Sequence, residues 1–446
     1  MASKQTLALA FYGDDFTGST DALEQLTLAG VRSALFIEPP TPKQLARFKN
    51  LQAIGVAGLT RSMTPAAMER ELGPAFKKLK TLGARHVHYK VCSTFDSSPK
   101  IGSIGRAIDV GAEVFRASFV PVLAAAPALG RYTIFGTHFA RYGIGSAGAI
   151  HRLDQHPSIS RHPITPMTEA DLRLHLAKQT KKRIGLFDIL NVSLPADAAR
   201  AALKQIVGEG AEVILFDALE AEHVARIGAL IDDCASGRQP LFSVGSSGIE
   251  MALGSHWGKR RFGGALASPV KQALVGSGSC SPVTSGQIAW ALKHGFAEVP
   301  LDAAGLASST KARLEIKQAT EAAIKLINAG RSVIVHTTRT GSDRRIAAKL
   351  GNYTAKILGF ALGEVLRGAL EQNKVRRVCI AGGDTSSYAA RALGVEALEM
   401  IASLTPGAPL CRATAPGSPA DGLEVVFKGG QVGGEDYFGV VLKGKR

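Results

Sequence analysis

The stretch Leu7-Ala-Leu-Ala-Phe-Tyr-Gly-Asp-Asp-Phe-Thr-Gly-Ser-Thr-Asp21 indicates the class of fold. An apolar run of strand length ends at Gly13, two carboxylates follow, and a segment with helical spacing begins. In open α/β sheets ligands collect at the carboxyl ends of strands. Asp14 and Asp15 are therefore candidates to hold substrate hydroxyls, a metal ion or a proton in transfer. The structural alternative is a helix cap, in which Asp15 or Thr17 accepts amide hydrogen bonds.

The same strand-then-helix order continues along the chain. We expect further strands at 33–37, 53–58, 87–92, 117–122, 183–190, 212–217 and 239–244. Such alternation favours a mainly parallel sheet covered by helices, with right-handed crossovers. Residues 129–166, rich in Gly, His, Arg and Tyr, break the rhythm, and we expect an irregular lid or pocket wall there.

The length and a change in composition predict two domains. A chain of 446 residues exceeds one ordinary core, and residues 258–269, rich in Gly, Ala, Arg and Ser, are the best candidate linker. A second α/β series follows, with expected strands at 272–275, 332–336, 377–381 and 423–426 and helices at 284–294, 311–327 and 344–372. Residues 437–442 also read as strand-like, so the glycine-rich segment before them suggests a hairpin loop. We therefore predict two α/β domains with mainly parallel sheets, 1–260 and 270–446, facing a shared cleft.

The net charge and the cysteine content limit the kinds of binding partner and the cellular compartment that we expect. The formal charge is +16, but the short basic runs are scattered and lack the interleaved aromatic residues that would stack bases. We expect small anionic ligands, no nucleic acid and no membrane. The five cysteines show no metal-ligand spacing, and neither a secretory leader nor a membrane-spanning run is present. These features predict a soluble cytoplasmic protein with reduced thiols, and a homo-oligomer is possible.

Two strand-to-helix turns in the second half suit phosphate groups. In Val275-Gly-Ser-Gly-Ser-Cys-Ser-Pro-Val-Thr284 the glycines allow close approach, Ser279 and Ser281 add hydroxyls, and a helix N-terminus follows. This turn lacks the third glycine of a dinucleotide fingerprint and the Gly-Lys-Ser/Thr of a P-loop, so a tight structural turn is the alternative. In Gly382-Gly-Asp-Thr-Ser386 the aspartate, Asp384, either caps the helix or holds Mg²⁺ through water.

Candidates for binding a substrate carboxylate lie in the first half. Lys90 ends an expected strand and is a natural carboxylate partner, although it could also extend along the sheet edge. Ser93 and Thr94 follow it closely. The turn Gly245-Ser-Ser-Gly248 could present amides to a carboxylate or serve packing alone. His162 lies in the irregular segment, where a surface or packing role is the alternative.

The opening motif, Gly13-Asp-Asp-Phe-Thr-Gly-Ser-Thr-Asp21, resembles that of the four-carbon acid sugar kinases, which phosphorylate tetronates and 3-oxo-tetronates with ATP. Later segments resemble that family's motifs in the same order: Lys90-Val-Cys-Ser-Thr-Phe-Asp-Ser97, His162-Pro-Ile-Thr-Pro-Met167, Gly276-Ser-Gly-Ser-Cys-Ser-Pro-Val-Thr284, Gly382-Gly-Asp-Thr-Ser386 and Phe427-Lys-Gly-Gly-Gln431. The resemblance spans nearly the whole chain. One motif departs from it, because the family's common Arg-Gly pair is replaced after Phe95 by Asp-Ser-Ser-Pro-Lys, which suggests a distinct branch.

The resemblance implies transfer of a phosphoryl group from ATP and Mg²⁺ to the terminal (C4) hydroxyl of a threonate, erythronate or 3-oxo-tetronate. It places ATP at the glycine turns of the second half, and its Lys-x-Gly segment extends the site to Gly430. The candidate nucleotide-binding residues are Ser279, Ser281, Gly382, Gly383, Asp384, Thr385 and Gly430. The candidate substrate-binding residues are Asp14, Asp15, Thr17, Lys90, Ser93, Thr94, His162, Gly245, Ser246 and Ser247. The residues that would bind the metal ion are not assigned.

Phosphoryl transfer needs mainly alignment and charge neutralisation, which suits glycine turns, basic residues and a few carboxylates. We expect Asp15 to orient or deprotonate the attacking hydroxyl, with Asp14 supporting it and binding substrate hydroxyls. The alternative enzyme class is an NAD(P)-dependent oxidoreductase acting on a small hydroxy acid, based on the strand-Gly-x-Gly-helix order at Val275. Against it stand the missing third glycine and the lack of a clear acidic ribose ligand. A nucleic-acid-binding protein rests on net charge alone.

Overall fold

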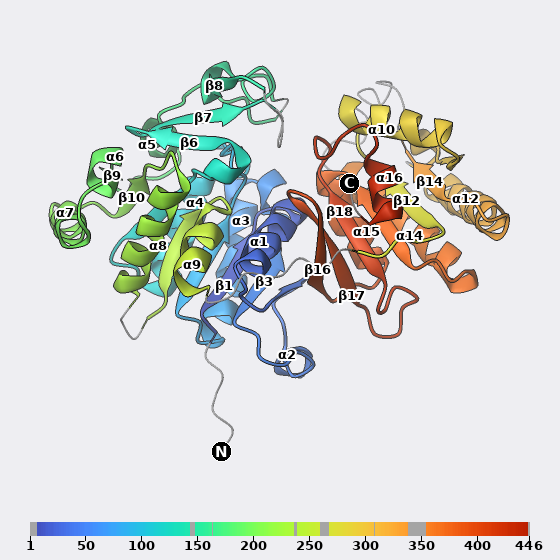
Figure 1. The fold of residues 1–446 in the computed structure, drawn as a ribbon, viewed down its shortest axis with the longest axis horizontal. Coiled ribbons are helices and arrows are strands. Elements are labelled where there is room, and N and C mark those ends of the chain that lie inside the picture. The colour runs from blue at the N-terminus through green and yellow to red at the C-terminus, as the bar shows by residue number, and fades with distance from the viewer. Residues whose placement is uncertain are drawn as a thin grey trace. The chain divides into compact units, whose positions relative to one another are not determined.

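The computed structural model describes residues 7–142, 148–162, 164–235, 239–258, 267–306, 308–337 and 354–444, apart from the side chains of Ser309, Thr310 and Asp384. The chain forms two compact units (Figure 1). Unit 1 consists of Met1–Asp14, Gln25–Ala34 and Pro39–Phe262, and unit 2 of Asp15–Glu24, Leu35–Glu38 and Gly263–Arg446. The division therefore falls between Asp14 and Asp15. Helix α1 (Phe16–Leu28) and strand β2 (Ser33–Phe36) each have residues in both units.

Unit 1 contains a parallel sheet in the order β3-β1-β4-β11-β5-β10-β9. Its strands are β1 (Leu9–Gly13), β3 (Ala53–Ala57), β4 (His86–Lys90), β5 (Val120–Leu123), β9 (Ile184–Phe187), β10 (Val213–Phe216) and β11 (Leu241–Gly245). All residues of β1, β3, β4, β5, β10 and β11 are buried, as expected for parallel strands covered by helices on both faces. Lys90 pairs in register with both Gly13 and Gly245, so three strands end at the same level.

The helices of unit 1 fill the intervals between its strands. They are α2 (Pro42–Leu45), α3 (Pro65–Thr81), α4 (Ile104–Phe115), α5 (Leu172–Ala177), α6 (Ile189–Val192), α7 (Ala196–Gly208), α8 (Ala221–Cys234) and α9 (Gly248–Trp257). Side-chain caps begin several of them: Thr64 accepts from the amide of Ala67 at the start of α3, and Ser103 accepts from Arg106 at the start of α4. The predicted α/β class is confirmed in this unit.

The segment 129–166 is more regular than expected. It contains β6 (Arg131–Ile134), β7 (Thr137–Arg141) and β8 (Ile150–Arg152), which pair antiparallel as a separate three-stranded sheet (Figure 1). The prediction of an irregular segment was wrong. These strands are short, and β6 and β7 alternate buried with half-buried residues, several of them polar, so they carry little of the apolar signal of a central strand.

Unit 2 contains a mixed sheet in the order β13-β14-β12-β15-β18-β17-β16. Its strands are β12 (Ala273–Ser277), β13 (Ala297–Pro300), β14 (Val333–His336), β15 (Arg377–Ala381), β16 (Ala397–Thr405), β17 (Ala408–Thr414) and β18 (Glu424–Lys428). The first five strands in that order are parallel, whereas β17 pairs antiparallel with β18 and β16. Leu35 and Phe36 of β2 extend the unit by pairing antiparallel with β16.

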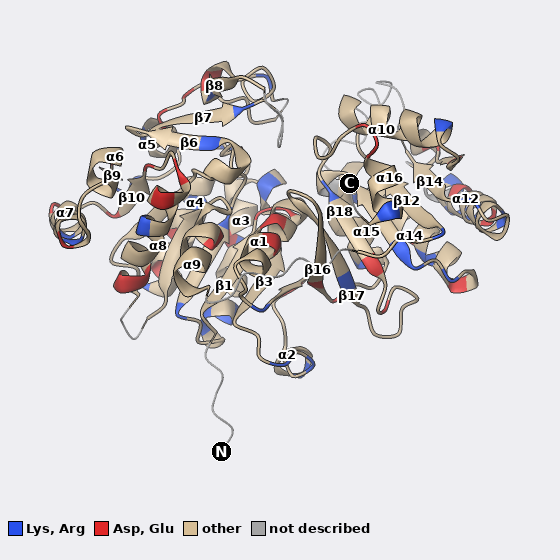
Figure 2. Ribbon diagram, in the orientation of Figure 1, with Lys and Arg blue, Asp and Glu red and all other residues tan. Residues whose placement is uncertain are grey.

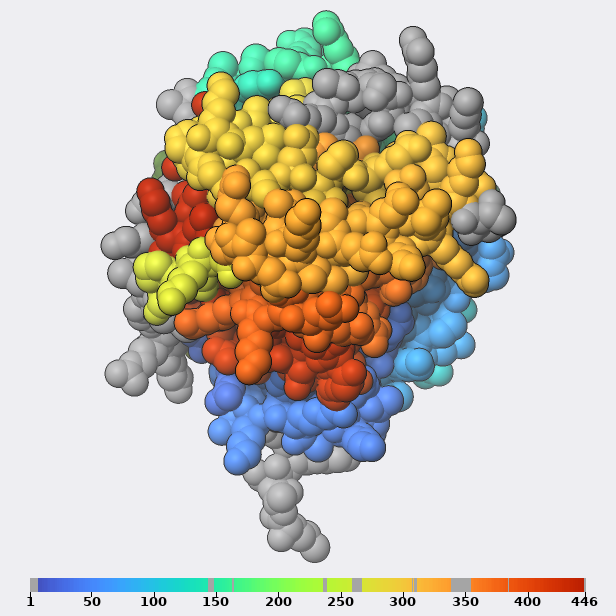
Figure 3. All heavy atoms as spheres, turned by 90° about the vertical axis from the view of Figure 1, so that its right-hand side faces the viewer, coloured from blue at the N-terminus to red at the C-terminus, as the bar shows by residue number. Residues whose placement is uncertain are grey.

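The helices of unit 2 are α10 (Pro282–Lys293), α11 (Ala303–Leu306), α12 (Ser309–Asn328), α14 (Thr354–Gln372), α15 (Gly383–Ala392) and α16 (Tyr437–Lys443). Figure 3 shows α12, in yellow-orange, on one face of this unit. The expected strand at 437–442 was wrong, because this segment is helix α16. Its short apolar run is buried, and such a run does not distinguish a strand from a buried helix. Of the proposed linker, residues 259–266 lie outside the described residues, as do 344–353 of the expected long helix.

Arg377 supports the sheet of unit 2 from inside its core. This side chain is fully buried, and its Nε donates to Glu424 Oε2 at 2.8 Å. Its terminal nitrogens donate to the carbonyls of Val441 at 2.6 Å and Ser268 at 2.8 Å. A buried charge is tolerated when it is paired and hydrogen-bonded in this way. The contact joins β15, β18 and the end of α16.

Basic residues are spread over many helices, strands and loops, as Figure 2 shows, and they do not gather on one element. Among the residues that the structure describes, no helix combines the length and apolar character required to cross a bilayer.

Glu24 fastens α1 to the β16–β17 hairpin within unit 2. Its carboxyl accepts the amide of Gly407 at 2.7 Å and the hydroxyl of Ser403 at 3.4 Å. The side chain is almost fully buried, and this burial raises its pKa to about 8. The folded state therefore binds the proton more tightly than the unfolded chain does. Glu24 lowers stability progressively as the pH rises from about 4.5 to about 8.

We therefore expect Glu24→Gln to raise the melting temperature at pH 8 to 9 and to change it little at pH 5. Glutamine keeps the acceptor for Gly407 without a buried charge, and we expect a gain of roughly 1 to 3 kcal/mol at pH 9. Thermal unfolding from pH 5 to 9 measures this difference. The exposed Glu371, changed to Gln, is the control and should show no such trend. A gain of equal size at pH 5 and pH 9 would contradict the titration of Glu24.

Candidate active site

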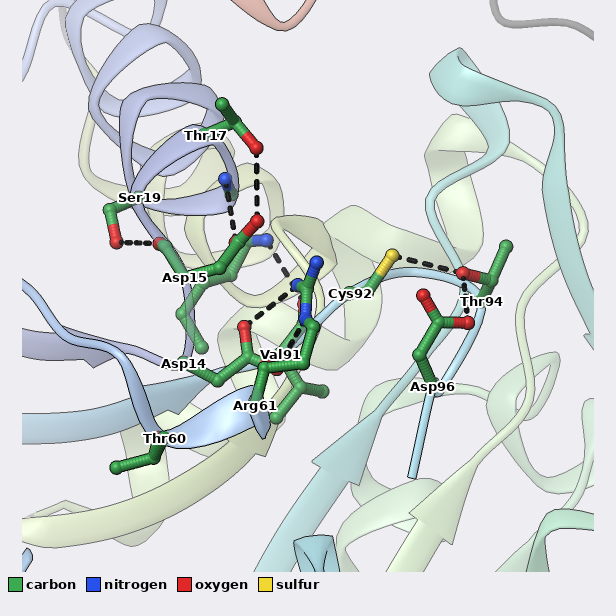
Figure 4. Close-up of polar contacts among 12 residues, drawn as sticks. Asp14, Asp15, Thr17, Ser19, Thr60, Arg61, Val91, Cys92, Thr94 and Asp96 are labelled. Atoms are coloured by element: carbon green, nitrogen blue, oxygen red, sulfur yellow. Dashed lines mark hydrogen bonds and ion pairs between the residues drawn. The ribbon is translucent and has the colours of Figure 1, made fainter. Parts of the chain in front are cut away.

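Asp14 lies at the carboxyl end of β1 in unit 1 and is held there by Arg61. The guanidinium of Arg61 contacts both carboxylate oxygens, at 2.9 and 3.2 Å, and its backbone amide donates to the Asp14 carbonyl at 3.0 Å (Figure 4). The Asp14 amide donates to the carbonyl of Lys90 at 2.8 Å. Asp14 is buried, so this bidentate pair fixes the orientation of its carboxylate.

The carboxyl end of β4 brings Lys90 to the same level. Lys90 is 2% exposed, and its ammonium donates to the carbonyl of Val91 at 3.0 Å. In the loop that follows, the Thr94 hydroxyl lies 2.9 Å from both Cys92 Sγ and Asp96 Oδ1, to which it donates (Figure 4). Burial raises the pKa of the Cys92 thiol to about 11, so this thiol is neutral near pH 7. The loop offers hydroxyl and carboxylate groups beside a cation.

His138 of β7 holds this loop in place. Its Nε2 lies 2.9 Å from the carbonyl of Ser93, and its Nδ1 lies 2.9 Å from the Thr133 hydroxyl. Because a carbonyl only accepts, Nε2 carries the proton and Thr133 donates to Nδ1. Burial lowers the pKa of His138 to about 4, which keeps the ring neutral. The three-stranded sheet thus positions Ser93.

The turn at Gly245-Ser246-Ser247-Gly248 has few amides left for a ligand. The amides of Ser246, Gly248 and Ile249 donate to Leu123, to Ser246 Oγ and to the Ser246 carbonyl. Gly245 and Gly248 are required by close packing, since a Cβ on either would lie 2.2 or 2.1 Å from a carbonyl oxygen. Ser247 Oγ is buried and has no hydrogen-bond partner among the described residues. Packing therefore accounts for most of this turn.

His162 makes contacts inside its own loop. Its Nδ1 accepts the amide of Thr165 at 3.1 Å and lies 3.0 Å from the Thr165 hydroxyl. Within the described part of the chain, no hydrogen bond joins it to Asp14, Lys90 or Ser93.

Asp15 begins α1 in unit 2 and caps this helix. Its Oδ1 accepts the amide of Gly18 at 2.8 Å, and its Oδ2 accepts the hydroxyl of Thr17 at 2.9 Å (Figure 4). The predicted capping role is therefore present. A carboxylate oxygen can accept more than one hydrogen bond, so a capping role does not by itself exclude a contact with a substrate hydroxyl.

Three loops of unit 2 lie close together near this cap: the loop at Ser279 and Ser281, the loop at Gly382 to Thr385, and the loop at Gly429 and Gly430. A Cβ built on Gly430 would lie 2.9 Å from Ser279 Oγ and 3.0 Å from Ser281 Cβ, so these two loops touch. A Cβ on Gly382 would lie 2.3 Å from Thr385 Oγ1 and 3.4 Å from the carbonyl carbon of Gly278. The structure thus brings together most of the candidate nucleotide-binding residues: Ser279, Ser281, Gly382, Gly383, Thr385 and Gly430.

Thr17 extends this group of loops to α1. Its Oγ1 lies 3.9 Å from a Cβ built on Gly429 and 4.0 Å from one built on Gly383. Hence Thr17, which we had placed with the sugar acid, lies beside the glycine loops of unit 2. The N-terminus of α15 also opens in this region, at Gly382.

Buried hydroxyls without partners line the same loops. Ser277 Oγ and Thr385 Oγ1 are more than nine-tenths buried and have no hydrogen-bond partner among the described residues. Buried polar atoms are normally satisfied, so these two hydroxyls, at the end of β12 and in the first turn of α15, indicate that a ligand or water completes their bonding.

The side chain of Asp384 lies outside the described residues. Elsewhere in the described chain, no three His, Cys, Asp or Glu side chains gather in a way that could hold a metal ion.

The candidate residues named from the sequence did not include three residues of this region, Arg61, His138 and Lys428. Arg61 follows the end of β3, and the neighbouring strand β1 ends at Gly13, just before Asp14, so a basic residue after an adjacent strand was the available signal. His138 acts through Ser93, 45 positions away, and no local pattern indicates that contact. Lys428 is the last residue of β18 and is fully buried. It lies in the motif Phe427-Lys-Gly-Gly-Gln431 quoted above, from which only Gly430 was taken as a candidate.

One α/β unit has carboxylate and lysine groups at its strand ends, and the other has converging glycine loops, features that suit a small-molecule phosphotransferase. Residues 9–253 match the family described as "Sugar-binding N-terminal domain", and residues 274–438 match "Nucleotide-binding C-terminal domain". The chain belongs to the four-carbon acid sugar kinase family.

Curated relatives cover nearly the full length of the chain. It is 44% identical to a 3-oxo-isoapionate kinase of Paraburkholderia graminis over 98% of this chain and 95% of the relative. It is 31% identical to a 3-oxo-tetronate kinase of Pseudomonas fluorescens over 97% of this chain and 96% of the relative. A crystal structure of a Salmonella typhimurium protein, provisionally named a tRNA synthase, is 25% identical with a TM-score of 0.77 and covers 97% of this chain and 98% of its own. That likeness supports the α/β fold.

Proposed function

We propose that this chain transfers the γ-phosphoryl group of ATP to a terminal hydroxyl of a short-chain sugar acid. The observation that carries the proposal is the environment of Asp15. It begins α1, and the neighbouring Thr17 lies against the glycine loops at Gly383 and Gly429. A carboxylate beside loops suited to phosphate is in the place required of a group that activates an acceptor hydroxyl.

Asp15 takes the proton of the attacking hydroxyl in this proposal. Its two hydrogen bonds from Gly18 and Thr17 hold the carboxylate in a fixed orientation. Asp14, fixed by Arg61, accepts substrate hydroxyls, and Lys90 pairs with the substrate carboxylate. Ser93 and Thr94 donate to the remaining oxygens. Of the turn at Gly245–Gly248, Ser247 is the residue whose hydroxyl has bonding capacity left.

The nucleotide is held by the loops of unit 2. Their glycines permit close approach of the phosphates, and the N-terminus of α15 and the hydroxyls of Ser277 and Thr385 supply donors. Mg²⁺ is bound in such sites mainly by the phosphates and water, with one or two carboxylates, and supplies charge neutralisation. We assign residues 1–260 to the sugar acid and 270–446 to the nucleotide, with Asp15–Glu24 grouped by contact with the latter.

The substrate that we place first is a 3-oxo sugar acid. The relatives that are 44% and 31% identical are named for 3-oxo-isoapionate and 3-oxo-tetronate. The departure after Phe95 lies in the loop that holds Ser93 and Thr94. We therefore rank 3-oxo-isoapionate and the 3-oxo-tetronates ahead of threonate and erythronate.

An ADP-release assay with ATP and Mg²⁺ tests the proposal. The panel contains 3-oxo-isoapionate, the 3-oxo-tetronates, D- and L-threonate, D- and L-erythronate and simple hydroxy acids as controls. We expect turnover with a 3-oxo acid and none with the controls. No ADP release with any acid of the panel, together with no effect of ATP on the melting temperature, would contradict a kinase function. A larger thermal shift from NAD(P) than from ATP would favour the oxidoreductase alternative.

A further inference from the structure

Lys428 is a fully buried lysine beside the glycine loops of unit 2. It ends β18, where it pairs in register with Ala381, the last residue of β15. Its own carbonyl accepts the amide of Gly382 at 2.9 Å, which begins the loop at Gly382 to Thr385. Lys428 is therefore part of the backbone support of one loop.

Its side chain supports the other loops through Thr284. The ammonium donates to Thr284 Oγ1 at 2.9 Å, and the Thr284 hydroxyl donates to the Gly430 carbonyl at 2.9 Å. While Lys428 is protonated it can only donate, so the Thr284 hydroxyl must direct its proton to Gly430. If the amine loses its proton, its lone pair can accept from Thr284, and the Gly430 carbonyl is released. The charge state of Lys428 thus determines whether the Thr284 hydroxyl donates to the Gly430 carbonyl.

No carboxylate neutralises this cation among the residues that the structure describes. The other group beside it is the Tyr437 ring, whose centroid lies 5.4 Å from Nζ. The ionisable groups facing it are Cys379 on β15 and Tyr437 on α16, and burial raises the pKa of both, so they are neutral near pH 7. From α10 it meets the neutral Thr284. Buried lysines are normally paired with a negative charge, and an anionic ligand in the adjacent loops would supply the counter-charge that the described residues do not.

We propose that Lys428 is a positioning residue whose buried charge favours anionic phosphates in the glycine loops, so that binding of ATP draws a proton onto this amine. The proposal rests on the proposed nucleotide-binding function. An anion in the loops stabilises the ammonium form, and the ammonium form holds Thr284 and Gly430 in place for the anion. The coupling is reciprocal, as linkage requires.

Proton uptake by the unchanged protein is the first test. Burial lowers the pKa of Lys428 to about 8. At pH 8.5, Mg-ATP binding should therefore take up roughly half to three-quarters of a proton, and little at pH 7. Isothermal titration in two buffers that differ in ionisation enthalpy measures this uptake. The γ-phosphate of Mg-ATP is already ionised at both pH values and does not contribute.

Lys428→Met separates this role from a structural one. Removing an uncompensated buried charge should leave the melting temperature of the ligand-free protein unchanged or higher. The same change should weaken Mg-ATP by roughly tenfold or more, weaken AMP far less, and abolish proton uptake. Lys428→Arg should retain affinity for Mg-ATP up to pH 9 without proton uptake, because arginine keeps its charge. The exposed Lys317, changed to Met, is the matched control.

The outcomes distinguish the two levels of the proposal. If the unchanged protein does not bind Mg-ATP, the proposed function fails, and this inference fails with it. If it binds Mg-ATP without proton uptake at pH 8.5, and Lys428→Met leaves the ratio of Mg-ATP to AMP affinity unchanged, the role of Lys428 is wrong and the kinase function stands.

Discussion

Asp15→Asn is expected to lower kcat by roughly 10²- to 10⁴-fold, the range typical of a lost general base. Asparagine is as good a helix cap as aspartate, so its side-chain oxygen still accepts the amide of Gly18 and α1 stays in place. The melting temperature should therefore change little, and the KM for ATP should change by only a few-fold. The ADP-release assay with the best acid of the panel measures the loss.

A second helix cap provides the matched control for Asp15. Asp188 begins α6 in unit 1 and accepts the amide of Asn191 at 2.8 Å, with no part in the proposed site. Asp188→Asn makes the same chemical change at a similar cap, and turnover should stay near that of the unchanged protein. Near-native kcat in a folded Asp15→Asn preparation would show that Asp15 only caps α1 and that another group activates the hydroxyl.

Gly382→Ala is expected to raise the KM for ATP by roughly a hundredfold. Gly382 has a φ of 133°, a conformation that residues with a Cβ rarely adopt. The added carbon would also meet Thr385 Oγ1 at 2.3 Å. The loop must shift to relieve this contact, and its shift moves Thr385 and the start of α15 away from the phosphates. Steady-state kinetics with varied ATP and titration with Mg-ATP both report the change.

Gly286 of α10 is the control for this substitution. A Cβ at Gly286 meets nothing within 4 Å, so Gly286→Ala should leave the KM for ATP unchanged. It should also stabilise the helix by roughly 0.5 to 1 kcal/mol. If Gly382→Ala folds and binds ATP as the unchanged protein does, the Gly382 loop is not part of the nucleotide site.

Much of the fold follows from local patterns that need no partner to be recognised. The apolar run before Gly13 became β1, and the later runs became β4, β11, β12 and β15, because buried parallel strands must be apolar on both faces. Patterns without that constraint were misjudged. The half-polar strands β6 and β7 were expected to be irregular, and the apolar segment 437–442 was expected to be a strand.

The candidate site divides in the same way. The residue types and their positions at strand ends singled out Asp14, Asp15, Lys90 and the glycine turns as candidates, since parallel topology gathers the strand ends of a sheet at one edge of that sheet. Only the tertiary structure paired Asp14 with Arg61 and placed Thr17 against the glycine loops. It also buried Lys428 and brought its ammonium within hydrogen-bond distance of Thr284. These contacts join residues 47, 366 and 144 positions apart or more. Sequence periodicity reports which face of an element is buried, but it carries no information on which distant element covers that face.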